Sequence, residues 1–163
     1  MTRCAWLLIG LMVGQAPLRP SEVEVPGLGV KLKAGWRLLL ENGCRYSVPA
    51  TWTVSGDGTV ASAANGSTLT VRFVPDLSRS SYKERVSRSR ESAMVVHEDT
   101  DRRLWVEFSD DRWMEHDIVV NNSVGACVAV LEFREGTGND EEIARIIADS
   151  IGFAPQRWPP SSR

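Results

Sequence analysis

The stretch Cys44-Arg-Tyr-Ser-Val-Pro-Ala-Thr-Trp52 decides how the fold of this chain begins. Successive side chains of a strand point to opposite faces of the sheet, so the cysteine, the tyrosine and the first valine of this stretch share one face. We expect that face to be the buried one. Pro49 has no amide hydrogen to donate to a neighbouring strand and therefore ends the strand. Trp52 follows it and is large enough to close one end of a core.

A hairpin is predicted immediately before this strand. Residues 36–40 are typical of a strand, and the turn Glu41-Asn42-Gly43 supplies the two residues that adopt positive φ in a tight hairpin. Further strands are predicted over residues 59–63, 68–74, 94–98, 103–109, 113–121 and 126–134. The joins between the strands after residue 94 are short, which indicates antiparallel neighbours in a meander. The strand at 126–134 places Cys127 on its apolar face.

Two helices are predicted. Ser81 and Glu84 have the spacing of a capping box, and the helix that they open runs to about residue 93. Its many cations and a Glu84 to Arg88 pair are typical of a solvated helix, with a patch for an anionic partner as the alternative. The second helix begins at Asn139 or Asp140, ends before residue 152, and docks on the sheet through a stripe of isoleucines.

Length and charge restrict the range of functions. A chain of 163 residues suits one domain with terminal extensions. Its formal net charge of −2 gives no basic field, so nonspecific nucleic-acid binding is not expected. Phosphate loops, dinucleotide fingerprints and the serine-nucleophile elbow are absent from the sequence, so we expect no cofactor and no catalytic residue of those kinds.

Residues 1–16 resemble a secretory signal, because one positive charge precedes a short apolar run that ends in small residues. The run is shorter than the roughly 20 residues that a spanning helix needs, so no permanent membrane span is expected. We predict an exported monomer, periplasmic or extracellular. Pro17 would be a poor first residue after cleavage. Residues 17–28 are predicted to be a flexible linker, residues 29–154 a single α+β domain, and residues 155–163 a disordered tail.

Removal of the leader leaves Cys44 and Cys127 as the remaining cysteines. In an oxidising compartment an isolated pair is more often bridged than free, so we predict a disulfide between them. The alternative is two buried thiols that pack as small apolar residues.

The order of these elements resembles the PsbP/Mog1-like group, in particular its small secreted bacterial members. The features that carry the resemblance are the leader, the hairpin entering Tyr46-Ser-Val-Pro-Ala-Thr-Trp52, the glycine-rich turns, the helix after residues 68–74, the meander and the closing isoleucine-rich helix. The resemblance implies an antiparallel β-sheet sandwiched between helices, and a binding or assembly module. It transfers no ligand-binding residue to this chain, which also has Ala-Thr before Trp52 where many relatives place a glycine.

The chain has two histidines, and both lie in predicted meander strands beside acidic residues. If the strands are neighbours, His97 and His116 together with Glu98 would form a site for a divalent transition metal. The alternative for His116 is a hydrogen-bonded core histidine, because it alternates with apolar residues. A set of acidic turn residues is a second candidate, for calcium, although turn formation alone explains them: Asp99, Asp101, Asp110 and Asp111.

Aromatic and charged residues of the meander form a candidate partner surface. Its members are Trp105, Trp113, Arg103 and Glu107. An uncovered face with exposed tryptophan is typical of a binding surface. The alternative is that the helix after residue 81 covers these side chains.

The sequence therefore favours an exported, non-enzymatic binding or assembly module that acts through a protein or envelope partner. One alternative is a small extracellular hydrolase or metal-binding protein that uses His97 and His116. The other is a purely structural envelope domain.

Overall fold

The computed structural model describes residues 23–25, 28, 30–89, 94–109, 113–134 and 140–155. The predicted leader at residues 1–16 lies outside these ranges, and so does the predicted tail apart from Pro155. Most of the predicted linker at 17–28 lies outside them as well. The structure nevertheless places strand β1 inside that linker, at Val23–Val25, where it pairs with residues 30–32.

The described residues form twelve strands and two helices. The strands are β1 (Val23–Val25), β2 (Val30–Leu32), β3 (Trp36–Glu41), β4 (Cys44–Pro49), β5 (Thr53–Val54), β6 (Val60–Ser62), β7 (Thr68–Pro75), β8 (Met94–Asp99), β9 (Arg103–Ser109), β10 (Trp113–Asn122), β11 (Gly125–Arg134) and β12 (Gly152–Phe153). The helices are α1 (Arg79–Ser89) and α2 (Asp140–Ser150).

A seven-stranded antiparallel sheet dominates the fold, with the strand order β5-β6-β7-β11-β10-β9-β8. The meander at its centre pairs β10 with β11 over their whole lengths, from Trp113 opposite Arg134 to Asn122 opposite Gly125. The antiparallel, meander-rich sheet predicted from the sequence is therefore confirmed. Strand β8 is the last strand of the sheet, beside β9.

The predicted first hairpin is also confirmed. Strands β3 and β4 pair in register around a turn in which Asn42 has φ 50° and Gly43 has φ 80°. The two residues that tolerate positive φ thus stand where a tight hairpin requires them. Strand β12, which the sequence did not predict, adds to the other side of β4 and completes a three-stranded sheet.

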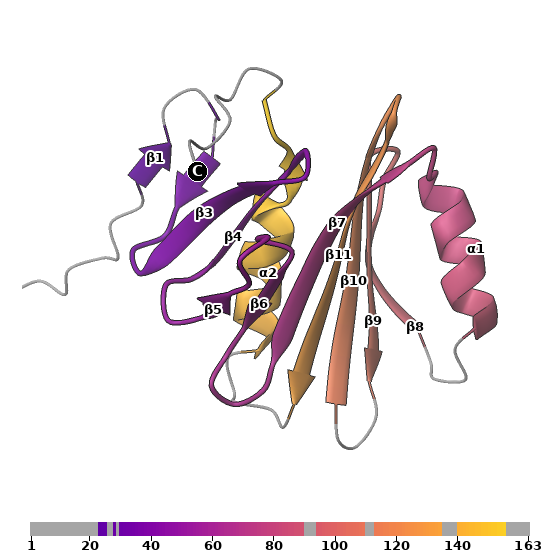
Figure 1. Ribbon diagram of the computed structural model, residues 1–163. Coiled ribbons are helices and arrows are strands. Elements are labelled where there is room, and N and C mark those ends of the chain that lie inside the picture. The colour runs from indigo at the N-terminus through magenta and orange to yellow at the C-terminus, as the bar shows by residue number, and fades with distance from the viewer. Residues whose placement is uncertain are drawn as a thin grey trace, which may run out of the picture.

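Each face of the large sheet packs against a different set of elements (Figure 1). On one face lie α2 and the three-stranded sheet, and the core between them includes Tyr46, Leu131 and Ile147. On the other face lies α1, whose buried side chains, among those the structure describes, are Tyr82 and Val86. The sandwich of helices predicted for the sheet is therefore only partly present. The β3–β4 hairpin shares one face with α2, and α1 contributes few buried side chains to the other face.

Helix α1 begins earlier than predicted. The amide of Ser81 donates to the hydroxyl of Ser78 at 3.1 Å, so Ser78 is the capping residue and Ser81 lies inside the first turn. The predicted Glu84 to Arg88 pair is present on the solvated side of the helix. Serine is a favourable capping residue and occurs at positions 78, 80 and 81. The spacing to Glu84 favours Ser81, and the prediction of the capping residue is therefore wrong by three positions.

The predicted disulfide joins the two sheets. Cys44 of β4 and Cys127 of β11 are both fully buried, bonded to each other, and have Cα atoms 5.8 Å apart. The apolar faces predicted for their strands are the faces that meet, because Tyr46 and Val48 are buried with Cys44, and Leu131 with Cys127. The first hairpin is therefore covalently fixed to the centre of the large sheet.

We predict that replacing both bridged cysteines, as Cys44→Ser with Cys127→Ser, lowers the free energy of unfolding by about 4 kcal/mol, because the link closes a loop of about 80 residues in the unfolded chain. Urea unfolding measures this loss. The matched control, made in the full chain that retains residues 1–16, is Cys4→Ser, which removes the third cysteine and should leave the unfolding midpoint unchanged. Alkylation of the denatured, nonreduced protein that labels Cys44 or Cys127 would contradict the bridge.

Candidate functional site

The two histidines of the chain meet on the face of the large sheet that also carries α2. His97 of β8, Glu107 of β9 and His116 of β10 come from three neighbouring strands. One potential ligand atom from each lies within 4.8 Å of the other two. We call these three residues, together with Trp105, the histidine cluster.

Strand register places two members of the cluster directly. Glu107 lies opposite His116 in the β9–β10 ladder, so both side chains leave the sheet on the same face. Trp105 lies two residues before Glu107 and therefore shares that face.

A β-bulge brings in His97. The β8–β9 ladder is regular from Met94 to Val96, and its register then shifts so that Glu98 lies opposite Trp105. His97 is the extra residue of β8. A bulge of this kind turns two consecutive side chains toward one face and re-aims them. His97 and Glu98 thus both lie on the cluster face, and the following residue returns to the opposite face.

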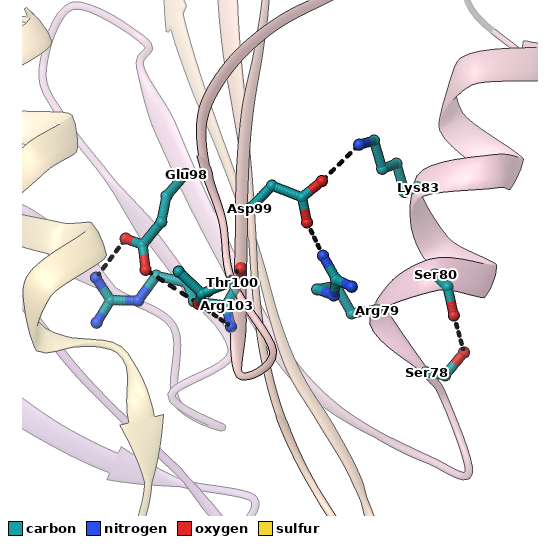
Figure 2. Close-up of polar contacts among 8 residues, drawn as sticks. All are labelled: Ser78, Arg79, Ser80, Lys83, Glu98, Asp99, Thr100 and Arg103. Carbon is teal, nitrogen blue, oxygen red and sulfur yellow. Dashed lines mark hydrogen bonds and ion pairs between the residues drawn. The ribbon is translucent and has the colours of Figure 1, made fainter.

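Figure 2 shows the consequence of the bulge for the two acidic residues that follow it. Glu98 accepts a hydrogen bond from Arg103 at 3.2 Å on one side of the sheet. Asp99 is directed to the other side, where it pairs with Arg79 and Lys83 of α1.

These ion pairs involve residues of both metal sites predicted from the sequence, the transition-metal site and the calcium site. The carboxylate beside the histidines is that of Glu107 and not that of Glu98, which is bound to Arg103. Of the four acidic turn residues considered for calcium, Asp99 pairs with two cations of α1, Arg79 and Lys83. Asp110 and Asp111 lie outside the described residues.

The contacts within the cluster are short and directional. Nε2 of His97 lies 2.7 Å from Oε2 of Glu107, and because the carboxylate accepts, this nitrogen carries the hydrogen. Oε2 of Glu107 is 4.0 Å from Nδ1 of His116. The indole of Trp105 stacks on the His97 ring, with ring centres 4.5 Å apart and planes inclined by 24°.

His116 is a neutral imidazole in this environment. Its side chain is fully buried, and burial lowers its pKa to about 4, with His97 adding to the effect and Glu107 opposing it. The indole nitrogen of Trp105 donates to Nδ1 of His116 at 3.2 Å. Since indole only donates, the hydrogen of the neutral ring is on Nε2. That buried nitrogen has no hydrogen-bond partner within the described ranges.

The cluster is open to solvent on the side of β8. The side chains of His97 and Glu107 are 24% and 16% exposed, whereas that of His116 is closed off. The histidine cluster therefore runs from the edge of the sheet into its interior, with one histidine at each end. Such an arrangement provides an outer group that can contact a ligand and an inner group with a fixed orientation.

The candidate partner surface divides between the two faces. Trp105, Arg103 and Glu107 share the cluster face, where Trp105 is half-buried against the core below α2. Trp113 lies on the opposite face and packs on the core that α1 covers. The four residues therefore do not form one surface, because an odd number of positions separates Trp113 from His116 on β10.

No protein-family model matches the sequence, and no match was found among curated proteins. Among solved structures, the chain is similar to that of cyanobacterial PsbP (CyanoP) from Synechocystis sp. PCC 6803. The match has a TM-score of 0.46 and 12% sequence identity, and it covers 81% of this chain and 98% of the other.

We predict that the burial of His116 makes stability depend on pH. Its pKa is about 4 in the folded protein and 6.5 in its ordinary range. The unfolded chain therefore takes up the proton first as the pH falls. The contribution of His116 to the free energy of unfolding is complete above about pH 6.5. It declines by about 3 kcal/mol as the pH falls to about 4. Urea unfolding of the metal-free protein at several pH values measures it.

His116→Gln is the matched variant for this measurement, because it removes the titrating ring and keeps an acceptor for Trp105. The free energy of unfolding of this variant should vary less over the same pH range, while His97→Gln should retain the wild-type dependence on His116. A His116 ring resonance that titrates near pH 6.5 in the folded protein would contradict the prediction.

Proposed function

We propose that this protein is an exported, non-enzymatic binding module that acts through a protein partner, which docks along strand β8. The observation that carries the proposal is the exposed edge of the large sheet at β8, whose one neighbour within the described part of the chain is β9. Val95 and Val96 lie next to each other on this edge and are 49% and 44% exposed. An open edge with exposed apolar residues is a template for an added strand.

The two valines would contact a docked strand from both faces of the sheet. Val95 lies opposite Glu107, on the cluster face, and Val96 lies opposite Val106, on the α1 face. Backbone hydrogen bonds of an added strand would supply affinity, and these side chains would supply selectivity.

The bulge at His97 limits what can dock. It breaks the regular edge after Val96, and the acidic Glu98 and Asp99 follow it. Bulges and charges at an edge oppose extended pairing between identical sheets. We therefore assign the edge to a short extended segment of a different protein, in keeping with a monomeric module.

Export is part of the proposal. It is supported by the leader-like residues 1–16 and by the disulfide, a bond that persists in oxidising compartments. In the ranges that the structure describes, neither helix combines the length and the apolar character that crossing a bilayer requires. We propose further that the chain is a small secreted bacterial protein of the PsbP/Mog1-like kind, with its sheet layered between helices.

Metal binding is the second candidate function, and a specific observation favours it. The two histidines converge with a carboxylate, as that hypothesis requires. A purely structural role would give no reason for the adjacent exposed valines at an edge.

We expect a photo-crosslinking residue at position 95 to capture a discrete partner in the native envelope, because a docked strand would lie in contact with it. The matched control is the same residue at Val124, which is 60% exposed but lies in the turn between β10 and β11. Val96→Lys should abolish the capture at position 95, since a charge at an edge opposes strand addition.

The proposal fails if positions 95 and 124 give the same products, or if Val96→Lys leaves the capture unchanged. Circular dichroism of each variant shows whether the sheet is retained.

A further inference from the structure

We infer that the histidine cluster is a binding site for Zn²⁺ or Cu²⁺, with His97, Glu107 and His116 as the protein ligands. This inference deepens the second candidate function, metal binding, by naming its ligands and the class of ion, and it does not depend on a partner at β8. Two imidazoles and one carboxylate are a ligand set that suits zinc and copper better than magnesium or calcium.

The distances lie within a small movement of a coordination sphere. Ligand atoms bound to zinc at about 2.0–2.2 Å in a tetrahedral site lie about 3.3 Å from one another. Nε2 of His97 and Oε2 of Glu107 are now 2.7 Å apart and would separate slightly. Oε2 of Glu107 and Nδ1 of His116 are 4.0 Å apart and would approach.

The three ligands differ in how firmly they are placed, which also suits a metal site. Glu107 and His116 are opposite each other in the central ladder, where the pairing of β9 and β10 fixes their separation. His97 sits at the bulge on the edge strand, where the backbone can adjust. An ion would thus enter from the exposed side, and solvent could occupy a fourth position beside His97.

The nitrogen of His116 that faces the cluster, Nδ1, accepts a hydrogen bond and therefore carries a lone pair. That lone pair now accepts a hydrogen bond from Trp105, so an ion bound to Nδ1 would displace the indole. The same indole stacks on His97. Metal binding must therefore change the environment of Trp105, and this change gives the inference an optical readout.

The test is titration of the tag-free full chain with zinc sulfate or copper sulfate, followed by calorimetry and by tryptophan fluorescence. A Cys4→Ser background removes the one cysteine outside the disulfide as a competing ligand. We expect one ion per chain, a change in fluorescence, and a melting temperature that rises with metal concentration. His97→Ala and Glu107→Gln should each weaken binding at least about tenfold, and Trp105→Phe should remove most of the fluorescence change.

The matched control is Glu98→Gln. Glu98 lies on the same face, next to His97 in sequence, but its carboxylate is bound to Arg103 (Figure 2), so its loss should leave metal affinity unchanged. His97 is on the edge strand, so His97→Ala should fold even if substitution of the buried His116 does not. The inference is overturned if neither ion binds at one per chain, if His97→Ala and Glu107→Gln bind as tightly as the wild type, or if Glu98→Gln weakens binding equally.

Discussion

The contact between the inward face of the β3–β4 hairpin and the inward face of β7 and β11 is the constraint on which the rest of the structure depends. Apolar side chains from both sheets fill this layer, and the Cys44–Cys127 bond fixes its two halves together. The hydroxyl of Tyr46 donates to the carbonyl of Gly58 inside the same layer, and burial raises the pKa of this tyrosine to about 12. With the hairpin in place, α2 has a defined position beside it, where Ser150 accepts from the amide of Ser47 at 2.8 Å.

This arrangement leaves the β8 side of the sheet less covered than its centre. Around His116 the sheet is closed by the core, whereas His97 and the two adjacent valines reach solvent at the edge. The histidine cluster and the open edge are therefore neighbours, since both depend on strand β8. A partner docked at Val95 would lie close to the exposed end of the cluster. Both candidate functions therefore depend on strand β8.

Much of the fold follows from local patterns. The alternation in residues 68–74 predicts the buried face correctly, because Leu69 and Val71 are buried and Thr70 and Arg72 are exposed. In residues 126–134 the predicted face is buried as well, and the first half of β11 is also buried on its other face, against the core that α1 covers. Asn42 and Gly43 predict the first turn because few other residues accept its backbone conformation. The short strands β5 and β12 were missed, since two residues carry no periodicity and exist only through the ladders that they join.

The histidine cluster is harder to predict from local sequence patterns than the fold. The sequence pairs His97 with His116, the two histidines of the chain, and favours Glu98 as their carboxylate because it follows His97. Regular alternation through β8 would place Glu98 on the face opposite to His97. The bulge breaks the alternation, and no residue type between Met94 and Asp99 marks it. The sequence predicts Glu107 and Trp105 as part of a partner surface, and the structure places both beside the histidines.

The longer strands, their apolar faces and the two cysteines that pair can be predicted from the sequence alone, because they depend on side-chain chemistry and on a period of two along a strand. Only the tertiary structure decided that Trp105 and Trp113 lie on opposite faces of one sheet and that Glu107 completes the cluster. The fold also pairs Asp99 of β8 with Arg79 and Lys83 of α1. Strand register and a single bulged residue control these placements, and both are set by contacts between strands that a linear pattern does not contain.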